Sequence, residues 1–333
     1  MRRTWVAAAS LGGTITMTSS GPDGQGVRPS LSVEQLLAAV PGLDDIAEVR
    51  ATTLNTLPGA SLTLEDVIQA LKWARAEVAD GAAGAVVIQG TDTIEETAYL
   101  LDLYWDSPAP LVVTGAMRPP QLPGADGPAN LVASVRVAAD DASRQRGVLI
   151  VLNDEIHGAR WARKMRASGP DAFASPSFGP LGYVDERRPA YGTAPSHRTT
   201  LPLPNPFTPP RVALLETHLG DDGAVLDVIA ASGFSGVVLA GFGVGHVSGQ
   251  LACAAQRAAA SIPVVLASRT GAGSTHRNSY SFDGSESDLI AKGAIPAGWL
   301  DARKSRVLLA CLLAGGTTTE DIRAEFEHRG KLL

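Results

Sequence analysis

Short, nearly continuous hydrophobic runs alternate along the chain with longer segments in which hydrophobic residues recur every three or four positions. Runs of the first kind are typical of strands buried on both faces of a parallel sheet, and segments of the second kind are typical of amphipathic helices. Strands are predicted at Thr4–Ser10, Gly84–Gln89, Leu111–Thr114, Val148–Asn153, Val212–Glu216, Gly236–Ala240 and Pro263–Ala267. Helices are predicted at Ser32–Val40, Thr63–Asp80, Ile94–Trp105, Gly127–Ser143, Leu226–Ser232, Gln250–Ser261 and Thr319–His328. The alternation predicts an α/β fold in which crossover helices cover both faces of a mostly parallel sheet.

Three helix starts have recognisable capping residues. Ser32 and Gln35 form the pattern of a capping box, and Thr63 is followed three positions later by Asp66. Thr93 directly precedes the segment Ile94–Trp105, so we expect its hydroxyl to cap that helix.

The helix–strand alternation stops between residues 195 and 210, where proline is frequent and no period is visible. Because proline disfavours helix and sheet interiors, this stretch is interpreted as a stiff linker. It separates a predicted N-terminal α/β domain, residues 1–194, from a smaller C-terminal α/β domain, residues 211–333. A second irregular stretch, Thr18–Pro29, is rich in Ser, Gly and Pro, and it is either a mobile flap or a plain surface loop.

The composition excludes several classes of function. The chain has 333 residues, of which 45% are hydrophobic and 19% charged, as in an ordinary globular protein. Its net charge of −6 and the lack of a basic stripe argue against a nucleic-acid partner. The longest apolar runs, such as Val148–Leu152 and Val307–Leu313, are too short to cross a bilayer, so no membrane role is expected.

Cysteine and histidine usage completes this picture. Cys253 and Cys311 lie in apolar helix-like stretches, so both are expected to be small buried residues and not a disulfide framework. We therefore expect a cytoplasmic protein, and we interpret the run after Met1-Arg2-Arg3 as a first core strand and not as a signal peptide. The six histidines show no metal-ligand spacing, so no metal site is predicted.

Two glycine–threonine loops hold the candidate chemistry. Gly12-Gly13-Thr14-Ile15 follows the first predicted strand, and Gly90-Thr91-Asp92-Thr93 follows the second. Both loops therefore belong at the carboxyl edge of a parallel sheet, where such folds place their ligands. A threonine hydroxyl on a glycine turn that leaves room for substrate is a candidate nucleophile, although Gly-Gly-Thr is common and such threonines often only cap helices. The pair of loops favours acyl transfer.

A hydroxyl nucleophile needs a base, and Lys164 is the best candidate in the sequence. It lies about ten residues beyond the strand predicted at Val148–Asn153, within reach of the same sheet edge. Burial and a carboxylate partner would hold it in place, and burial would lower its pKa, although its basic neighbours are more typical of a solvated surface lysine.

Several longer motifs occur in an order that resembles the bacterial-type L-asparaginases, the family of asparaginases and glutaminase-asparaginases. Besides the two threonine loops, they are Glu95–Tyr99, Thr114–Pro119, Ala125–Pro128, Asn130-Leu131, Arg146–Leu149, Phe178–Tyr183 and Lys304–Leu309. The resemblance covers nearly the whole chain. It implies a larger N-terminal and a smaller C-terminal α/β domain, hydrolysis of a side-chain amide without a cofactor, and a dimer or a tetramer built from two dimers.

The resemblance also implies roles for individual residues. Thr14 corresponds to the nucleophile, Thr91 and Lys164 to the groups that activate it or the attacking water, and Asp92 to the group that holds the lysine and the substrate α-amino group. Substrate contacts are implied for Gly13, Gly59, Ala60, Ser61, Gly90, Asp92 and Ala116.

Some positions depart from the family pattern. Val27 stands where the family has a flap tyrosine, Gln89 replaces a histidine, and Ser61 is the one hydroxyl near the usual carboxylate-binding pair. His246 stands at a family asparagine, and residues 278–280 stand about where a glutamate would reach the neighbouring subunit. The hydrolytic groups are thus kept while the substrate contacts have changed.

Three functions therefore remain open. The first is hydrolysis of L-asparagine to L-aspartate and ammonia. The second is the same chemistry on glutamine, D-asparagine or another amide, with weaker or different selectivity. The third is a non-catalytic amino-acid-binding protein, which retention of Thr14, Thr91, Asp92 and Lys164 disfavours.

Overall fold

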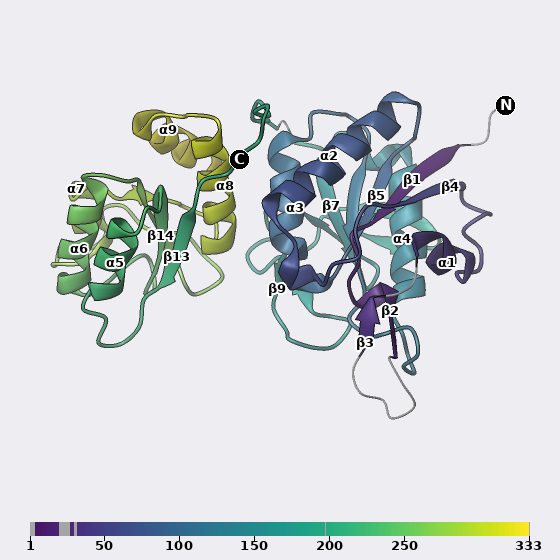
Figure 1. Cartoon of the computed structure of the whole chain (residues 1–333), viewed down its shortest axis with the longest axis horizontal. Coiled ribbons are helices and arrows are strands. Elements are labelled where there is room, and N and C mark those ends of the chain that lie inside the picture. Colours follow the sequence, from purple (N-terminus) through teal and green to yellow (C-terminus); the bar gives the residue numbers. More distant parts are fainter. Residues whose placement is uncertain (1–3, 20–26, 30–31, 197, 333) are drawn as a thin grey trace. The chain divides into compact units, whose positions relative to one another are not determined.

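The chain divides into two compact units, Met1–Leu201 and Pro202–Leu333, each with its own sheet. The structure is a computed structural model that describes residues 4–19, 27–29, 32–196 and 198–332. Figure 1 shows the helices and strands of both units, which are described here one at a time.

The N-terminal unit is built on an eight-stranded sheet with the order β12-β11-β8-β7-β6-β5-β1-β4. Its parallel part consists of β4 (Glu48–Thr53), β1 (Trp5–Ser10), β5 (Ala85–Ile88), β6 (Leu111–Thr114) and β7 (Val148–Leu152). The antiparallel part consists of β8 (Glu155–Gly158), β11 (Gly182–Asp185) and β12 (Arg188–Tyr191). The prediction of a mostly parallel sheet is confirmed.

Helices cover both faces of this sheet (Figure 1). One face packs on α1 (Val33–Ala38) and α4 (Gly127–Ala139), whose apolar side chains share a buried cluster with Val6, Val86 and Val112. The alternate strand residues face α2 (Leu64–Ala79) and α3 (Ile94–Tyr104), which pack on each other and on the central strands. Burial on both faces explains why β1, β5, β6 and β7 have continuous hydrophobic sequences.

Strand β4 and the antiparallel strands were not predicted from the sequence. In β4 no residue is fully buried, because this strand lies at the sheet edge and pairs only with β1. The strands β8, β11 and β12 are only four residues each, too short for a visible period. Short two-stranded pieces, β2 (Met17–Ser19) with β3 (Val27–Pro29) and β9 (Arg163–Lys164) with β10 (Phe173–Ala174), complete this unit.

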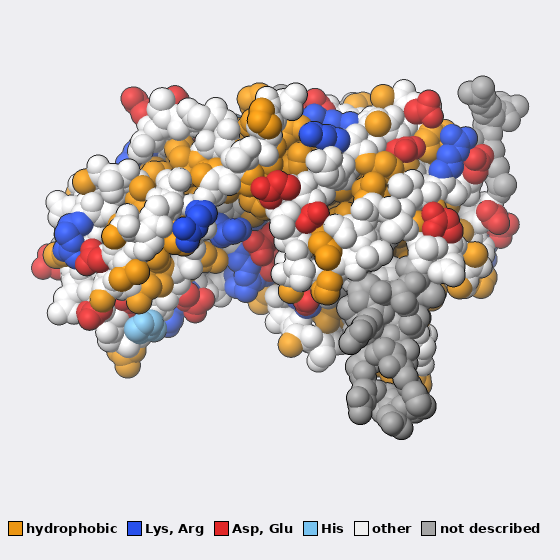
Figure 2. All heavy atoms as spheres, in the orientation of Figure 1, with side chains coloured by type: hydrophobic (Ala, Val, Ile, Leu, Met, Phe, Trp, Pro, Cys, Tyr) orange, Lys and Arg blue, Asp and Glu red, His pale blue; other side chains and the backbone are white. Residues whose placement is uncertain are grey.

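The C-terminal unit has a four-stranded parallel sheet in sequential order. Its strands are β13 (Val212–Glu216), β14 (Gly236–Gly241), β15 (Val264–Ser268) and β16 (Ile295–Pro296). Its helices are α5 (Ala224–Ala231), α6 (Gly249–Ala259), α7 (Glu286–Ala291), α8 (Ala302–Ala314) and α9 (Thr319–Arg329). Hydrophobic side chains are exposed over α5 (Figure 2), where Val225 is 53% and Val228 65% exposed.

Local predictions are partly confirmed. The capping boxes at Ser32 and Thr63 form as expected. The helix predicted at Gly127–Ser143 ends at Ala139 and is followed by a separate 3₁₀ turn, Asp141–Ser143. The prediction that both cysteines are buried is wrong for Cys253, which lies on the exposed side of α6, while Cys311 is buried. No helix within the described ranges is long and apolar enough to span a membrane.

Candidate active site

Four loops meet at the carboxyl edge of the N-terminal sheet because the strands before them are parallel neighbours in the order β4-β1-β5-β6. The loops comprise residues 54–61, 11–14, 89–93 and 115–118, respectively. Backbone hydrogen bonds continue from the strands into these loops, from Leu57 N–H to Leu11 O (3.1 Å) and from Leu11 N–H to Ile88 O (2.8 Å). The strand order thus brings together segments that are up to a hundred residues apart in the sequence.

Three glycines let the loops approach one another at backbone distance. A Cβ atom on Gly13, whose φ is +92°, would lie 2.0 Å from the amide nitrogen of Gly90. A Cβ atom on Gly90 would lie 2.8 Å from the amide nitrogen of Gly59. Real side chains do not tolerate such distances, so glycine is required for the three loops to touch. Because each of Gly13 and Gly90 directly precedes a threonine, this contact brings the backbones of Thr14 and Thr91 close together.

Lys164 extends from β9 to the second threonine loop. Its Nζ donates hydrogen bonds to Thr91 Oγ1 (2.9 Å) and to Asp92 Oδ1 (2.8 Å). Thr91 is buried and the Lys164 side chain is only 16% exposed, while the Asp92 side chain is 62% exposed. A buried hydroxyl and a partly buried amine therefore lie beside a carboxylate that faces solvent. This arrangement suits proton transfer at the hydroxyl and binding of a cationic group at the carboxylate.

Thr14 begins a 3₁₀ turn, Thr14–Thr16, directly after Gly13. The Thr16 hydroxyl donates to the Gly13 carbonyl oxygen at 2.8 Å and closes this turn from within. Thr14 itself is half-buried. It therefore lies at the surface of the loop cluster.

The Thr93 hydroxyl does not cap helix α3, so that prediction is wrong. It donates instead to the Gly59 carbonyl oxygen at 2.9 Å and accepts from Gln89 Nε2 at 3.2 Å. Gln89 is fully buried, and its Nε2 also contacts Gly90 O at 3.3 Å. These three side-chain and backbone groups form a relay that ties the loop of residues 54–61 to the second threonine loop. The sequence shows Gln89 as a polar residue at the end of a hydrophobic strand, but it does not show that Thr93 is its hydrogen-bond partner.

A second set of bonds holds the loop of residues 115–118. The Asp126 carboxylate accepts from Met117 N–H and Arg118 N–H, both at 2.9 Å. Asn130 Nδ2 donates to Gly115 O at 2.9 Å and to Asp126 Oδ2 at 3.1 Å. In the sequence both residues are only parts of a motif, because their role depends on where α4 begins. They fix the loop that contains the buried Ala116.

The remaining predicted substrate contacts lie in the turn Gly59–Ser61. Gly59 is buried against Gly90, whereas Ala60 and Ser61 are exposed. The Ser61 N–H donates to Pro58 O at 2.9 Å and so closes the turn. The side chain of Val27, in the place of the flap tyrosine, and flap residues 20–26 lie outside the described part of the chain.

The C-terminal unit has its own cluster of polar and aromatic groups. His246 Nε2 lies 3.1 Å from Glu286 Oε2, and Glu286 Oε1 accepts from the Ser279 and Tyr280 amides at 2.7 and 2.9 Å. Burial is the largest influence on the Glu286 carboxyl and raises its pKa, but the hydrogen bonds from these amides and from His246 together hold the pKa below its usual value. The fully buried Glu286 thus fixes both His246 and the loop that the resemblance places near a neighbouring subunit.

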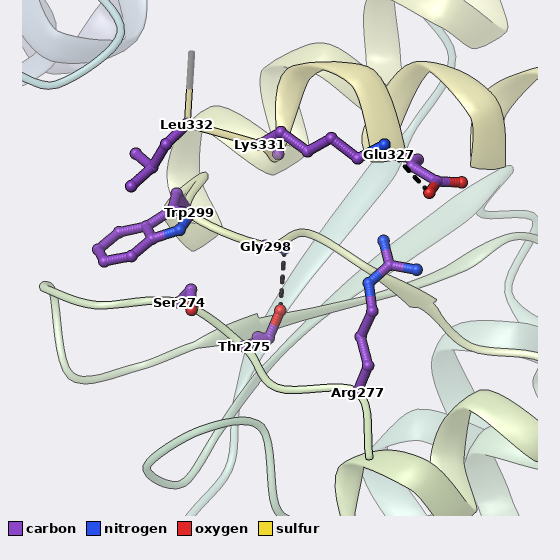
Figure 3. A pocket seen from close by; sticks show the side chains of 9 residues that line it. Ser274, Thr275, Arg277, Gly298, Trp299, Glu327, Lys331 and Leu332 are labelled. Atoms are coloured by element: carbon purple, nitrogen blue, oxygen red, sulfur yellow. Dashed lines mark hydrogen bonds and ion pairs between the residues drawn. The ribbon is translucent and has the colours of Figure 1, made fainter. Parts of the chain in front are cut away.

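A pocket of about 510 Å³ in the C-terminal unit contains none of the predicted site residues (Figure 3). Trp299 and Arg277 lie along its wall, and Thr275 Oγ1 accepts from Gly298 N–H at 2.9 Å. Within the described ranges no group of three His, Cys, Asp or Glu side chains is arranged to hold a metal ion. The threonine loops are therefore the candidate active site.

Comparisons with known proteins identify the family of this chain. The family model for the N-terminal asparaginase domain matches residues 5–197, and the model for the glutaminase/asparaginase C-terminal domain matches residues 211–326. A probable L-asparaginase of Deinococcus radiodurans is 36% identical over 326 residues, 96% of each chain. A probable periplasmic L-asparaginase of Haemophilus influenzae is 32% identical over 97% of this chain and 92% of its own. The crystal structure of a probable cytoplasmic L-asparaginase from Campylobacter jejuni superposes with a TM-score of 0.87, at 29% identity, over 97% of this chain and 99% of its own.

Proposed function

Because the chain belongs to the asparaginase family, we propose that it hydrolyses the side-chain amide of L-asparagine to L-aspartate and ammonia. The observation that carries the proposal is the hydrogen-bonded set of Lys164, Thr91 and Asp92 beside the loop of Thr14. A site that only binds an amino acid has no need of a partly buried amine bonded to a buried hydroxyl.

The proposed reaction has two steps and uses Thr14 as nucleophile. In the first, Thr14 Oγ attacks the amide carbon, the C–N bond breaks, and the leaving nitrogen takes a proton and departs as ammonia. In the second, water attacks the resulting ester and releases the new carboxylate and the Thr14 hydroxyl. Lys164, as the free amine, accepts the proton of the Thr91 hydroxyl, and Thr91 activates the attacking group.

The exposed Asp92 carboxylate is proposed to bind the substrate α-amino group. One of its oxygens already bonds Lys164, and its 62% exposure leaves the rest of the carboxylate accessible to a second cation. The α-carboxylate is proposed to bind at Gly59–Ser61, through the Gly59 and Ala60 amides and the Ser61 hydroxyl. Gly13, Gly90 and Ala116 would contribute backbone surface to the same site.

A second candidate is the same chemistry on another amide, such as glutamine or D-asparagine. It is supported by the turn Gly59–Ser61, in which Ser61 is the one side-chain hydroxyl. Each missing hydrogen bond to a carboxylate weakens binding by about 1–3 kcal/mol if nothing replaces it. The substrate comparison below separates this candidate from the first.

We further propose a homotetramer of two dimers, and a cytoplasmic location. The assembly is suggested by the resemblance and by the ordered loop that Glu286 holds in the C-terminal unit. The location is suggested by Cys253 and Cys311, neither of which forms a disulfide, and by the name of the Campylobacter jejuni protein, although the Haemophilus influenzae relative is named periplasmic. Light scattering after size-exclusion chromatography measures the assembly. Limited proteolysis tests the predicted division of the chain into two domains at the linker, residues 195–210.

Ammonia release from L-asparagine, L-glutamine and D-asparagine tests the proposed activity. The assay compares the native protein with Thr14→Ala and with Thr14→Ser, which keeps a hydroxyl. We expect turnover of L-asparagine that Thr14→Ala abolishes and Thr14→Ser retains in part. Greater turnover of another amide would favour the second candidate, and no turnover of any amide by the folded protein would refute the enzymatic function.

A further inference from the structure

His157 is a buried histidine of β8 that neither the sequence motifs nor the proposed reaction uses. It is 1% exposed, and both of its ring nitrogens have partners. Nδ1 lies 3.0 Å from Ser175 Oγ, and Nε2 lies 3.0 Å from Glu155 Oε2. Ser175 is itself only 3% exposed, so this set is closed to substrate and serves the structure around it.

The partner Ser175 directly follows β10, the strand that pairs with the one bearing Lys164. In this small hairpin Phe173 lies opposite Lys164 and Ala174 opposite Arg163. The bond between His157 and Ser175 therefore ties the β10 side of the hairpin to the main sheet through β8. A shift of Ser175 would move Lys164 through its paired strand.

The β9 side of the hairpin is tied to the same strand by a turn. The Trp161 and Ala162 amides donate to the carbonyl oxygen of Gly158, the last residue of β8, at 3.0 and 3.1 Å. Both strands of the hairpin are thus anchored on β8, one by its backbone and one by the imidazole of His157. A side-chain substitution can remove the hydrogen bond between His157 and Ser175, whereas it leaves the backbone hydrogen bonds to Gly158 in place.

The partners also define the protonation state of the ring. Burial lowers the pKa of His157, although the neighbouring Glu155 carboxylate acts in the opposite direction. In the neutral ring, Nε2–H donates to the carboxylate and Nδ1 accepts from the Ser175 hydroxyl. The Nε2–H donor thus meets a carboxylate acceptor, and the Nδ1 acceptor meets a hydroxyl donor.

We propose that His157 is a positioning residue for Lys164: its hydrogen bond to Ser175 holds the β9–β10 hairpin where the Lys164 amine reaches Thr91 and Asp92. The kinetic part of this inference rests on the proposed amidase function, whereas the placement of Lys164 does not. Because a displacement of about 1 Å at a reacting group reduces rates by up to 100-fold, a loosened hairpin lowers kcat.

Two polar substitutions separate the two hydrogen bonds of the ring. The amide of asparagine is attached at Cγ, so His157→Asn places an acceptor near the position of Nδ1 and keeps the bond to Ser175. The amide of glutamine lies one bond further out, so His157→Gln keeps the bond to Glu155 and loses the bond to Ser175. Ser175→Ala removes the same bond from the other side.

We expect kcat to fall about 10-fold or more in His157→Gln and in Ser175→Ala, and to stay within about threefold of the native value in His157→Asn. KM should change less than about threefold in all three. Tyr191→Phe is the matched control, because it removes a part-buried side-chain hydrogen bond to Ser143 (2.8 Å) from Tyr191 on β12, which lies two strands away from β8 in the sheet. It should leave kcat unchanged at a similar loss of thermal stability.

A second readout is independent of turnover. Trace acetylation with acetic anhydride, quantified by mass spectrometry, measures how accessible each lysine amine is. Labelling of Lys164 should rise severalfold in His157→Gln and in Ser175→Ala but not in His157→Asn. Lys292, with a side chain 19% exposed and paired with Asp288, serves as internal control and should not change.

The outcomes are distinct. An inactive native protein with the expected Lys164 labelling would refute the proposed function and support the positioning role. Unchanged kcat and unchanged labelling in His157→Gln would overturn the positioning role, as would equal losses of kcat in the asparagine and glutamine variants.

Discussion

Replacing Thr93 by valine removes a hydroxyl while keeping the shape of the side chain, and it breaks the relay between Gln89 and Gly59. Two hydrogen bonds are lost, the one donated to Gly59 O at 2.9 Å and the one accepted from Gln89 Nε2 at 3.2 Å. Each contributes about 0.5–1.5 kcal/mol net, so the free energy of unfolding should fall by about 1–3 kcal/mol. We expect the upper end of this range because the Gln89 side chain is fully buried and has few other hydrogen-bond partners.

The same substitution should affect substrate binding more than the chemical step. The relay fixes Gly59, which is proposed to bind the substrate carboxylate, and it does not include the bond between Lys164 and Thr91. If about 0.5–1.4 kcal/mol of the loss appears in binding, KM rises about 2- to 10-fold. We expect kcat to stay within about twofold of the native value.

Urea denaturation and steady-state ammonia release measure these two effects. Thr93→Ser, which keeps the hydroxyl, should behave like the native protein. Thr52→Val, at a half-buried threonine of the edge strand β4, controls for the exchange of threonine for valine. If Thr93→Val left both the unfolding free energy and KM at the values of the two controls, the relay would have no role in forming the site.

Three further predictions concern the amine, the glycine contact and the buried carboxylate. Lys164→Met should reduce kcat about 100-fold or more while the protein stays folded by circular dichroism, because acid–base catalysis typically contributes that much. Gly13→Ala should unfold the protein or lower its melting temperature strongly, since the new Cβ would lie 2.0 Å from the amide nitrogen of Gly90. Gly81 has a similar φ of +105° but nothing within 4 Å of a new Cβ, so in chemical denaturation Gly81→Ala should lower the free energy of unfolding by only about 1–2 kcal/mol. The ionised Glu286 carboxylate, whose pKa is lowered in the folded state, contributes its full stabilisation above about pH 4.5, and this stabilisation is lost as the pH falls through the folded-state pKa. Glu286→Gln should therefore make the free energy of unfolding less dependent on pH in the acid range.

Sequence patterns identified the elements whose side chains are buried in a regular way. The ends of the central strands β1, β5, β6 and β7 were predicted within one residue, because burial on both faces leaves a hydrophobic run in the sequence. The helices between them were predicted within two residues, except for the end of α4, which was placed four residues too late. Strand β4 at the edge was missed because its half-exposed residues include charged and polar ones.

For the candidate site, the sequence determined which chemical groups are present: hydroxyls, a carboxylate and an amine, on loops that follow strands. Only the tertiary structure decided which of them touch. The bond from Lys164 to Thr91 spans 73 positions in the sequence, and it depends on an antiparallel hairpin anchored by His157. The contact of Gly13 with Gly90 depends on β1 and β5 being neighbours in the sheet. Local periodicity records the burial of each segment, but it does not record strand order, and strand order is what brings these loops together.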